Sequence, residues 1–314
     1  GPEGTFTHQA AMTAADQFAT LGDFDLIALP DVPAIMQAVQ SRQGWGVIAW
    51  ENNVEGYVVP NLDALIDAPR GRFARISVDV AFNAFTVRGH SIYDCTGNPV
   101  SAHRTVWPNA PRFIAEHHLQ PRTRISNAAA CRDLKPGRVA LGPSICGELY
   151  DLDTLAEHVQ DFDGAHTEFL VIAPRDVVQE LNARAHSNDA GDFETIITFI
   201  PLVTGPGVLA DLLDVLRDAG LNMTSFISRP IKGHDGTYSF IATLDAAPWE
   251  PRFRTALEEI AGHGDWAKTL AVYPRRERPN PPVDAWMLPE AAPITNRAPE
   301  GWQYTEEARK ELLW

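Results

Sequence analysis

The sequence predicts an α/β protein in which a long α/β region is followed by a smaller domain. Short apolar strands alternate with amphipathic helices over residues 1–175, which favours a largely parallel or mixed sheet. A polar stretch with Asn, Asp and Gly near its end interrupts this alternation over residues 176–192 and is expected to be a linker. Residues 193–274 then follow the order βαββαβ, which is typical of a ferredoxin-like domain.

In the long region, helices are expected where apolar residues recur at helical spacing behind a capping residue or a proline. Thr5 or Thr7 can cap the first of them. The expected helices cover residues 4–20, 32–41, 61–66, 111–118, 127–134 and 144–150. The expected strands cover residues 25–30, 45–50, 75–87, 100–102, 124–126, 138–141 and 167–173.

In the smaller domain, a Gly-Pro-Gly turn opens a helix that Gly220 ends. A second helix is expected over residues 251–261. Strands are expected over residues 193–203, 223–227, 238–244 and 266–273, with a His234-Asp235-Gly236 turn before the third of them. The remaining tail, residues 275–314, is rich in Pro and Glu, and residues 305–313 have the pattern of one amphipathic helix.

Composition excludes several classes of function. The chain has 314 residues and is 45% apolar, which is enough for two domains with their own cores. It carries 26 basic and 41 acidic residues and a net charge of −15, so a nucleic-acid partner is not expected. An anionic substrate would need a local basic pocket against this overall field.

The three cysteines, Cys95, Cys131 and Cys146, fit neither a zinc pattern nor a disulfide framework. We expect reduced thiols, no metal and a cytoplasmic location. No apolar run approaches the ~18 residues of a membrane span, and no signal peptide is visible, so no membrane partner is expected.

Three separated segments combine hydroxyl, amide and carboxylate groups with glycine at predicted strand ends. They are Gly1-Pro2-Glu3-Gly4-Thr5-Phe6, Glu51-Asn52-Asn53-Val54-Glu55-Gly56 and His166-Thr167-Glu168-Phe169. Strand ends of an open α/β sheet converge at a cleft, which is where small-molecule sites form.

In this order, the segments resemble the prephenate dehydratase family, whose motifs are a GPxGTF start, an ENS-type loop followed by Gly, and a TRF segment. The first is intact here, Asn53 replaces Ser in the second, and Glu168 replaces Arg in the third. The family normally has a short apolar strand just before GPxGTF; either it lies outside the printed chain or the first sheet has one strand fewer.

The resemblance implies two α/β lobes arranged as in periplasmic binding proteins, with the substrate cleft between them. The first lobe would comprise about residues 1–75 and 162–175, and the second about 76–161. It also implies that residues 193–274 form an ACT regulatory domain, and that the protein is a homodimer or homotetramer.

The resemblance further implies roles for individual residues. Thr167 matches the threonine that faces the leaving hydroxyl, and Glu168 occupies the position of the family arginine. The matched substrate-binding residues are Thr5, Phe6, Glu51, Asn52, Asn53, Gly56, His103, Arg104, Asn109, Ser126, Asn127 and Phe169. No metal or organic cofactor is needed, because aromatisation drives the reaction.

Glu168 makes the third motif ambiguous, because prephenate is a dianion and like charges repel. Glu168 can turn outward, Arg104 or another basic residue can supply the missing charge, or the substrate can differ. A Glu with a raised pKa in a closed cleft can also act as a proton donor.

In the ACT-like segment, Pro206, Gly207, Val208, Leu209, Asn222, Ser228, Arg229 and Pro230 match the effector-binding residues of the family. Ile227 replaces the Glu of the family's ESRP motif. The resemblance implies an amino-acid effector, L-phenylalanine.

Three functions follow as alternatives. The first is a prephenate dehydratase-type lyase of L-phenylalanine biosynthesis, which forms phenylpyruvate, water and CO₂ under amino-acid regulation. The second is a prephenate decarboxylase or a lyase acting on a related cyclohexadienyl acid. The third is a non-catalytic sensor of amino acids or other metabolites.

Overall fold

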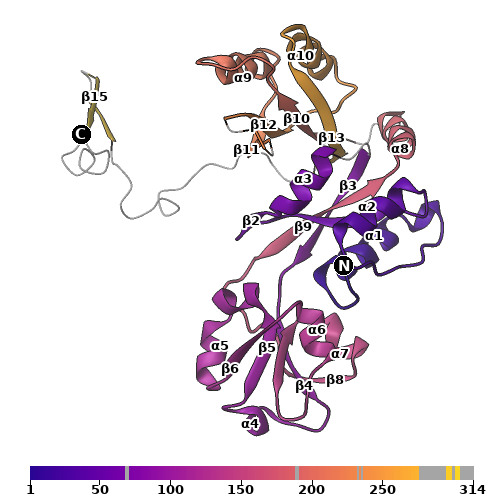
Figure 1. The fold of residues 1–314 in the computed structure, drawn as a ribbon, viewed down its shortest axis with the longest axis vertical. Helices are drawn as coiled ribbons and strands as arrows, with labels where there is room; N and C mark the ends of the chain where they lie inside the picture. Colours follow the sequence, from indigo (N-terminus) through magenta and orange to yellow (C-terminus); the bar gives the residue numbers. More distant parts are fainter. Residues whose placement is uncertain are drawn as a thin grey trace. The chain divides into compact units, whose positions relative to one another are not determined.

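Three β-sheets with helices packed on them form the scaffold of Gly1–Arg275 (Figure 1). The computed structural model describes residues 1–67, 71–187, 191–231, 233–234, 236–275, 295–298 and 301–304. The two sheets of the long region and the ferredoxin-like sheet that follows confirm the predicted fold class.

The first sheet has the strand order β2-β1-β9-β3, and every pair in it is antiparallel. Its strands are β1 (Gly46–Asn52), β2 (Gly56–Tyr57), β3 (Gly71–Asp79) and β9 (His166–Ala173). The prediction of a largely parallel or mixed sheet is wrong here. β1 and β3 run in the same direction, but β9 returns from far along the chain and enters between them in the opposite direction.

Helices cover both faces of this sheet. α1 (Phe6–Gln17) and α8 (Arg175–Ser187) pack on the face that carries Phe169 and Val171. α2 (Val32–Gln40) and α3 (Val59–Asp67) pack on the other face, which carries Leu170 and Ile172. Successive residues of β9 thus serve different cores, as the alternation of a strand requires.

Two side chains fix the starts of these helices. Thr5 caps α1, as predicted, because its Oγ1 accepts a hydrogen bond from the His8 N–H at 3.3 Å. Asp31 caps α2 by accepting from the Ala34 N–H at 2.8 Å. These caps satisfy backbone donors that the first turn of a helix leaves unpaired.

The second sheet is mixed and has the order β6-β5-β7-β4-β8. Its strands are β4 (Asn83–Val87), β5 (Pro99–His103), β6 (Gln120–Arg124), β7 (Val139–Gly142) and β8 (Leu152–Ala156). The helices here are α4 (Ile92–Cys95), α5 (Pro111–Glu116), α6 (Asn127–Arg132) and α7 (Ile145–Leu149). Short 3₁₀ helices lie at η1 (Ala19–Leu21) and η2 (Arg104–Asn109).

Two antiparallel strands, β3 and β9, connect the first sheet to the second (Figure 1). Where they leave the first sheet, the Val80 N–H donates to the Ala165 carbonyl at 2.7 Å. The single strand predicted over residues 75–87 is therefore wrong. It is interrupted after Asp79, where the chain passes from one sheet to the other.

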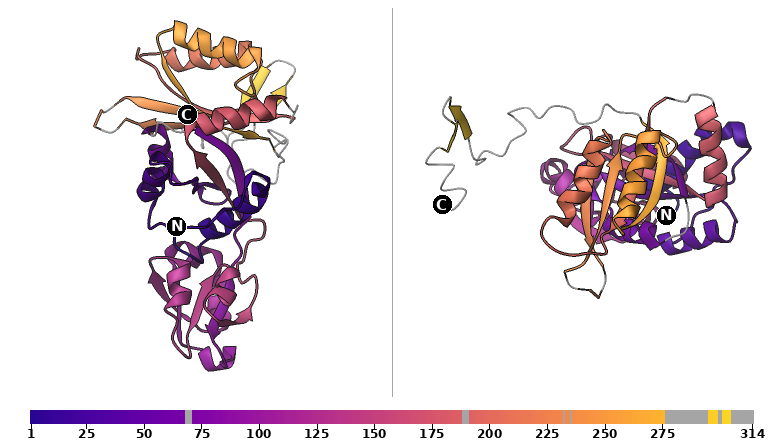
Figure 2. Two further views of the ribbon diagram at one scale, coloured as in Figure 1. Left: turned by 90° about the vertical axis from the view of Figure 1, so that its right-hand side faces the viewer. Right: turned by 90° about the horizontal axis from the view of Figure 1, so that it is seen from above.

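The third sheet has the order β11-β12-β10-β13 and carries α9 (Val208–Asp218) and α10 (Pro251–Gly262). Its strands are β10 (Phe193–Ile200), β11 (Met223–Pro230), β12 (Tyr238–Leu244) and β13 (Trp266–Pro274). The chain order βαββαβ confirms the ferredoxin-like prediction. α9 and α10 cover one face of the sheet, while Ile196, Ile241 and Tyr273 on the other face share a core with α3 and the first sheet (Figure 2).

The strand predicted over residues 25–30 does not form. Its apolar side chains are not buried: Ile27 is 76% exposed and Leu26 is 44% exposed. Residues of this segment line a cavity of about 440 Å³ together with Trp45 and Val47. An apolar run becomes a strand only where a neighbouring strand pairs with it, and among the described residues no strand pairs with residues 25–30.

Most of the predicted linker is helical, because α8 extends over Arg175–Ser187. Its polar composition belongs to a solvated helix that buries Val178 and pairs Arg184 with Glu180 at 2.5 Å. The strand β8 was not predicted. Asp153 and Thr154 in it are exposed, so its sequence lacks the alternation of apolar and polar residues that indicates a strand.

The tail contains an antiparallel strand pair that was not predicted, β14 (Thr295–Ala298) and β15 (Gly301–Tyr304). The helix predicted over residues 305–313 lies outside the described residues, as does Asp235 of the predicted turn. Cys95, Cys131 and Cys146 are free and buried, as predicted. Within the part of the chain that the structure describes, no helix has the length and apolarity needed to span a bilayer.

Candidate active site

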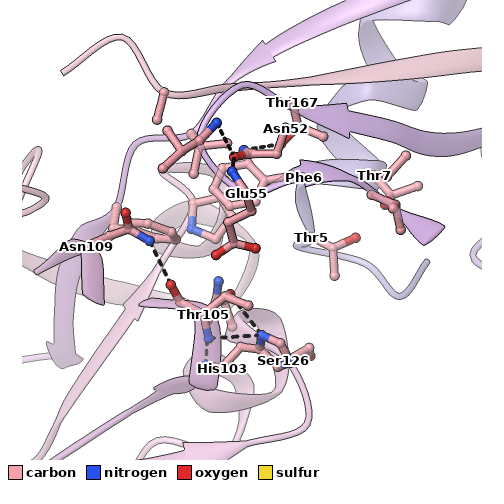
Figure 3. A pocket seen from close by; sticks show the side chains of 18 of the residues that line it. Thr5, Phe6, Thr7, Asn52, Glu55, His103, Thr105, Asn109, Ser126 and Thr167 are labelled. Atoms are coloured by element: carbon pink, nitrogen blue, oxygen red, sulfur yellow. Dashed lines mark hydrogen bonds between the residues drawn. The ribbon is translucent and has the colours of Figure 1, made fainter. Parts of the chain in front are cut away.

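A cavity of about 400 Å³ lies at the passage between the first and second sheets (Figure 3). The predicted site residues that line it are Thr5, Phe6, Asn52, His103, Asn109, Ser126, Asn127, Thr167 and Phe169. Lining residues that were not predicted are Thr7, Ala49, Val54, Glu55, Val58, Val80, Phe82, Thr105, Ile125, Pro143 and Ala165. The three sequence segments therefore meet at one cavity.

Thr167, on β9, is held by the side chain of Asn52 at the end of β1. Asn52 Nδ2 donates to Thr167 Oγ1 at 3.0 Å and to the His166 carbonyl at 3.1 Å. Asn52 Oδ1 accepts from the backbone N–H groups of Val54 and Glu55, both at 2.9 Å. Because the Thr167 oxygen accepts from Asn52, its own hydrogen is available for donation to a ligand.

The first turn of α1 borders the cavity through Thr5, Phe6 and Thr7. Backbone N–H groups at a helix N-terminus favour a bound anion. The Thr5 hydroxyl itself is engaged, because it donates to the Pro2 carbonyl at 2.7 Å and accepts from the His8 N–H. Thr5 thus shapes the turn that presents the start of α1.

The second sheet supplies the opposite wall, on which most polar groups are already bonded. Asn127 Oδ1 accepts from the His103 N–H at 2.7 Å, and Asn109 Nδ2 donates to the Thr105 carbonyl at 2.7 Å. His103 Nδ1 accepts from the Thr105 N–H at 3.4 Å and lies 2.9 Å from Thr105 Oγ1. Burial and the nearby Arg104 lower the pKa of His103, while Glu55 opposes this. A neutral His103 therefore carries its proton on Nε2 and can donate from there.

Glu55 is the carboxylate among the cavity residues that were not predicted. Its carboxylate reaches from the loop after β1 toward the side of the cavity that carries Thr105 and His103 (Figure 3). The sequence signal for Glu55 was its place within the Glu51–Gly56 segment, directly before β2, which pairs back onto β1. Among the described residues that line the cavity, none is Lys or Arg.

Glu168 does not line the cavity, so the interpretation that it is a proton donor in the cleft is wrong for this geometry. Thr167 and Phe169 line the cavity, and the alternation of β9 turns Glu168 to the other face. There it is 7% exposed, and its Oε2 lies 3.2 Å from Arg75 Nε. The Glu168 side chain therefore points away from the cavity, which was one of the alternatives. Arg75 is the basic residue that compensates its charge.

Four predicted substrate-binding residues also lie outside the cavity lining: Glu51, Asn53, Gly56 and Arg104. Glu51 is directly opposite Glu168 on β1, behind the cavity. Asn53 instead closes the loop, because its Nδ2 donates to the Gly164 carbonyl at 2.9 Å and its Oδ1 accepts from the His166 N–H at 2.8 Å. Gly56 has a φ of 80°, which a side chain would strain.

Comparison with known proteins identifies the family to which this geometry belongs. Residues 1–177, which include all three segments, match the family described as "Prephenate dehydratase". The chain belongs to the prephenate dehydratase family. A prephenate dehydratase of Mycolicibacterium gilvum is 29% identical over 255 residues, which cover 76% of this chain and 78% of that protein. The protein is accordingly an enzyme.

Two solved structures show the same fold. One is a prephenate dehydratase from Arthrobacter aurescens in complex with L-Phe, with a TM-score of 0.73, 23% identity and 88% of each chain covered. The other is GqqA, described as a novel type of quorum quenching acylase, with a TM-score of 0.73, 22% identity and 88% of this chain and 96% of that chain covered. These two proteins have the same fold but are described with different activities. The activity therefore has to be inferred from the residues of the cavity and not from the fold.

Two acidic side chains lie on paired strands behind the cavity, because Glu51 on β1 is directly opposite Glu168 on β9. Burial raises the pKa of Glu51, a hydrogen bond from Tyr57 opposes this, and Glu168 raises it further. Burial also raises the pKa of Tyr57 to about 12, while its hydrogen bond with Ser225 opposes the shift. Glu51 thus holds its proton more tightly than an exposed Glu.

The residues matched to the effector site of the family lie on the ferredoxin-like domain. Gly207 has a φ of 92° at the start of α9, a conformation that favours glycine. Arg229 on β11 forms two hydrogen bonds with Asp63 of α3, at 3.1 Å and 3.2 Å. Arg229 therefore joins this domain to α3, which packs on the first sheet.

Proposed function

We propose that the protein is a prephenate dehydratase-type lyase that converts prephenate into phenylpyruvate, water and CO₂. The observation that carries this proposal is the Thr167 hydroxyl in the cavity, whose oxygen is occupied by Asn52 Nδ2 at 3.0 Å. That bond leaves the hydroxyl hydrogen to be donated to a leaving group. The family match over residues 1–177 supports the same reaction.

In this reaction the bond between the ring and its carboxylate breaks, and CO₂ leaves. The electron pair enters the ring, and the bond from the ring to the hydroxyl on the opposite carbon breaks. The departing hydroxyl takes up one proton from the solvent and leaves as water, and the product is aromatic. A hydrogen bond from Thr167 to the departing oxygen stabilises the charge that develops there.

Binding of the substrate carboxylates is proposed to depend on neutral donors and a helix terminus. The first turn of α1 offers backbone N–H groups, and neutral His103 offers its Nε2–H. Such groups hold a carboxylate without the strong stabilisation that a buried cation would give. A carboxylate that must leave as CO₂ reacts faster when its ground state is not overstabilised.

The geometry favours dehydration over decarboxylation with retention of the hydroxyl. The decarboxylase interpretation needs a proton donor at the ring, and Glu168 was the candidate. Its side chain lies behind β9 in an ion pair with Arg75. The sensor interpretation has no comparable support, because the curated relatives are named as enzymes.

The test is incubation of the purified full chain with prephenate, followed by identification of the product. We expect phenylpyruvate, and we expect Thr167→Val to lower kcat by about 100-fold or more, as the loss of one transition-state donor does. Thr167→Ser should retain most of the activity, and Thr13→Val on the exposed side of α1 serves as the surface control. A non-aromatic keto acid, or full activity in Thr167→Val, would refute the proposal.

We also propose that the ferredoxin-like domain is an ACT domain that binds an amino acid, with L-phenylalanine as the effector, in a homodimer or homotetramer. The related Arthrobacter aurescens structure was solved with L-Phe bound, which supports this choice. Calorimetry with L-phenylalanine and the activity at increasing effector concentration test it. Absence of heat on titration would contradict the effector assignment.

A further inference from the structure

A buried ion-pair bridge lies between the ferredoxin-like sheet and the back of the strand that carries Thr167. Arg75 on β3 contacts Glu168 on β9, with 3.2 Å between Nε and Oε2. The same guanidinium contacts Glu194 on β10, with 3.5 Å between Nη1 and Oε2. These three side chains are 13%, 9% and 8% exposed, so solvent screens their interaction little.

Arg75 is held at this point by further contacts. Its guanidinium carbon lies 5.3 Å from the centre of the Tyr273 ring on β13, within the range of a cation–π interaction. One side chain thus contacts β9 of the family domain together with β10 and β13 of the ferredoxin-like sheet. A shift of the ferredoxin-like sheet would therefore move the Arg75 guanidinium, which is the ion-pair partner of Glu168.

Glu168 in turn is one residue from Thr167. Glu51 on β1 pairs directly with Glu168 and Asn52 with Thr167, so the two rungs of the β1–β9 ladder are adjacent. The pair of Glu51 and Glu168 lies on the buried side of the sheet. The next pair, Asn52 and Thr167, lies on the cavity side and is joined by the hydrogen bond between their side chains. A displacement of Glu168 along or across the sheet therefore alters the placement of the Thr167 hydroxyl.

Two carboxylates share the Arg75 guanidinium, those of Glu168 and Glu194. Glu51 pairs with Glu168 on the neighbouring strand, and His166 Nε2 lies 3.7 Å from Glu168 Oε1. Two like charges that face one cation compete for it, so the position of Arg75 depends on both. Breaking a buried pair is costly because it leaves an uncompensated charge. The Arg75 side chain is therefore expected to keep its contacts with both carboxylates, so that a movement of one carboxylate is passed on to the other.

We propose that Arg75 is a positioning residue for Thr167, and that Glu194 makes this positioning depend on the state of the ferredoxin-like domain. Binding of the effector to that domain then changes turnover through Glu194, Arg75 and Glu168. This inference rests on the proposed dehydratase function and its amino-acid regulation. It adds the residues that transmit the regulation.

The experiment compares Glu194→Gln and Arg75→Lys with the wild type in the full chain. Glu250→Gln is the matched control, because Glu250 pairs with Arg252 at 2.7 Å within the ferredoxin-like domain. The concentration dependence of phenylpyruvate formation on L-phenylalanine is measured, and calorimetry reports effector binding separately. Thermal unfolding establishes that each variant folds.

We expect the wild type to show a coupling factor between about 5 and 150, as allosteric pairs of sites do. In Glu194→Gln this factor should fall toward 1, while L-phenylalanine still binds and basal kcat stays within about 3-fold of the wild type. In Arg75→Lys the factor should also fall toward 1, and kcat should fall with it, because Thr167 loses its positioning. Unchanged kcat in Arg75→Lys would contradict the positioning role. Glu250→Gln should keep the wild-type factor. Undiminished inhibition in both bridge variants, or loss of effector binding in them, would overturn the inference.

A second measurement separates this inference from the proposed function. Hydrogen exchange of the backbone over residues 165–170 does not depend on knowing the substrate. Glu194→Gln should speed exchange there by about 3-fold or more relative to Glu250→Gln, because β9 loses support from the other domain. An unchanged rate of hydrogen exchange in Glu194→Gln would overturn the inference even if the enzyme forms phenylpyruvate. Failure to form phenylpyruvate, with altered exchange, refutes only the reaction.

Discussion

Asn52 and Thr167 are joined by a hydrogen bond of 3.0 Å that connects the end of β1 to β9 at the cavity. Asn52 is the donor, since its Oδ1 is occupied by two backbone N–H groups of the following loop. The bond therefore sets both the position of the Thr167 oxygen and the direction in which its hydrogen points. A hydroxyl that would be a weak donor in free rotation becomes an oriented one.

Replacing Asn52 should thus impair turnover more than substrate binding. We expect Asn52→Ala to lower kcat by up to about 100-fold with little change in KM, because the catalytic hydroxyl loses its orientation. Asn52→Asp should be equally damaging, since a carboxylate accepts from Thr167 and turns its hydrogen away from the substrate. Steady-state kinetics with prephenate provide the measurement.

Asn53 offers the matched control for this experiment. It holds the same loop through hydrogen bonds with the backbone of Gly164 and His166, whereas Asn52 bonds the Thr167 hydroxyl. Asn53→Ala should lower stability while leaving kcat within about 3-fold of the wild type. An equal loss of kcat in both variants would mean that loop order, and not the orientation of Thr167, determines turnover.

The site residues that could be predicted from the sequence are those in which a polar side chain lies at the end of a predicted strand. Asn52 and Thr167 lie at strand ends next to glycine or a turn, so their convergence followed from the α/β pattern. The outward direction of Glu168 was also predictable in principle, because neighbours in a strand face opposite sides. This direction stayed one of several alternatives, because the motif alone does not say which face of the strand borders the cavity.

Other features depend on contacts that no local pattern encodes. The compensation of Glu168 by Arg75 requires the register of β3 against β9, which places Ser77 opposite Glu168 and Arg75 two residues further along. Residues 25–30 have a strand-like composition, but no strand pairs with them in the part of the chain that the structure describes. Glu55 was overlooked because a glutamate in a loop is usually a solvated charge, and only the tertiary fold brings it to the cavity.

The packing of α2 on β1 predicts a sharp difference between two neighbouring glycines. A Cβ on Gly46 would lie 2.5 Å from Ile35 Cγ2 and 3.1 Å from Val39 Cγ2, both in the buried core under α2. Gly46→Ala should therefore lower the free energy of unfolding by about 1–3 kcal/mol, the usual cost of overpacking. Urea unfolding measures this.

Gly44 provides the control, because a Cβ there meets no heavy atom within 4 Å. Gly44→Ala should change the free energy of unfolding by less than about 1 kcal/mol and can raise it by restricting the unfolded chain. Equal destabilisation of the two variants would show that the contact with Ile35 is relieved by a shift of α2.

The docking of the ferredoxin-like domain predicts a measurable coupling between Arg229 and Asp63. Their bidentate contact, at 3.1 Å and 3.2 Å, is 21% exposed on each side. A double-mutant cycle with Arg229→Gln and Asp63→Asn should give a coupling energy of about 1 kcal/mol, because the pair is bidentate and partly shielded. The exposed pair of Arg217 and Asp214 should give a smaller coupling energy in the same assay, because solvent screens it. Coupling in the first pair no larger than in the second would mean that apolar packing alone holds the domain in place.

The raised pKa of Glu51 predicts how stability depends on pH. In the unfolded chain Glu51 titrates near its ordinary value of 4.5, whereas burial raises its pKa in the folded protein. Between these two values the folded state retains a proton that the unfolded state has lost. The free energy of unfolding therefore includes a contribution from Glu51 that is complete below the unfolded pKa and is lost as the pH rises through the folded pKa.

Glu51→Gln isolates this contribution, because glutamine keeps the shape of the side chain and does not titrate. We expect the variant to gain stability relative to the wild type as the pH is raised from about 5 to about 8, since it avoids a buried charge beside Glu168. Urea unfolding of both proteins across this range gives the difference directly. Glu250→Gln controls for the loss of a charge in an Arg-paired glutamate away from this cluster. A difference between wild type and Glu51→Gln that stays constant with pH would show that Glu51 is ionised in both states, with Arg75 balancing Glu51 as well as Glu168.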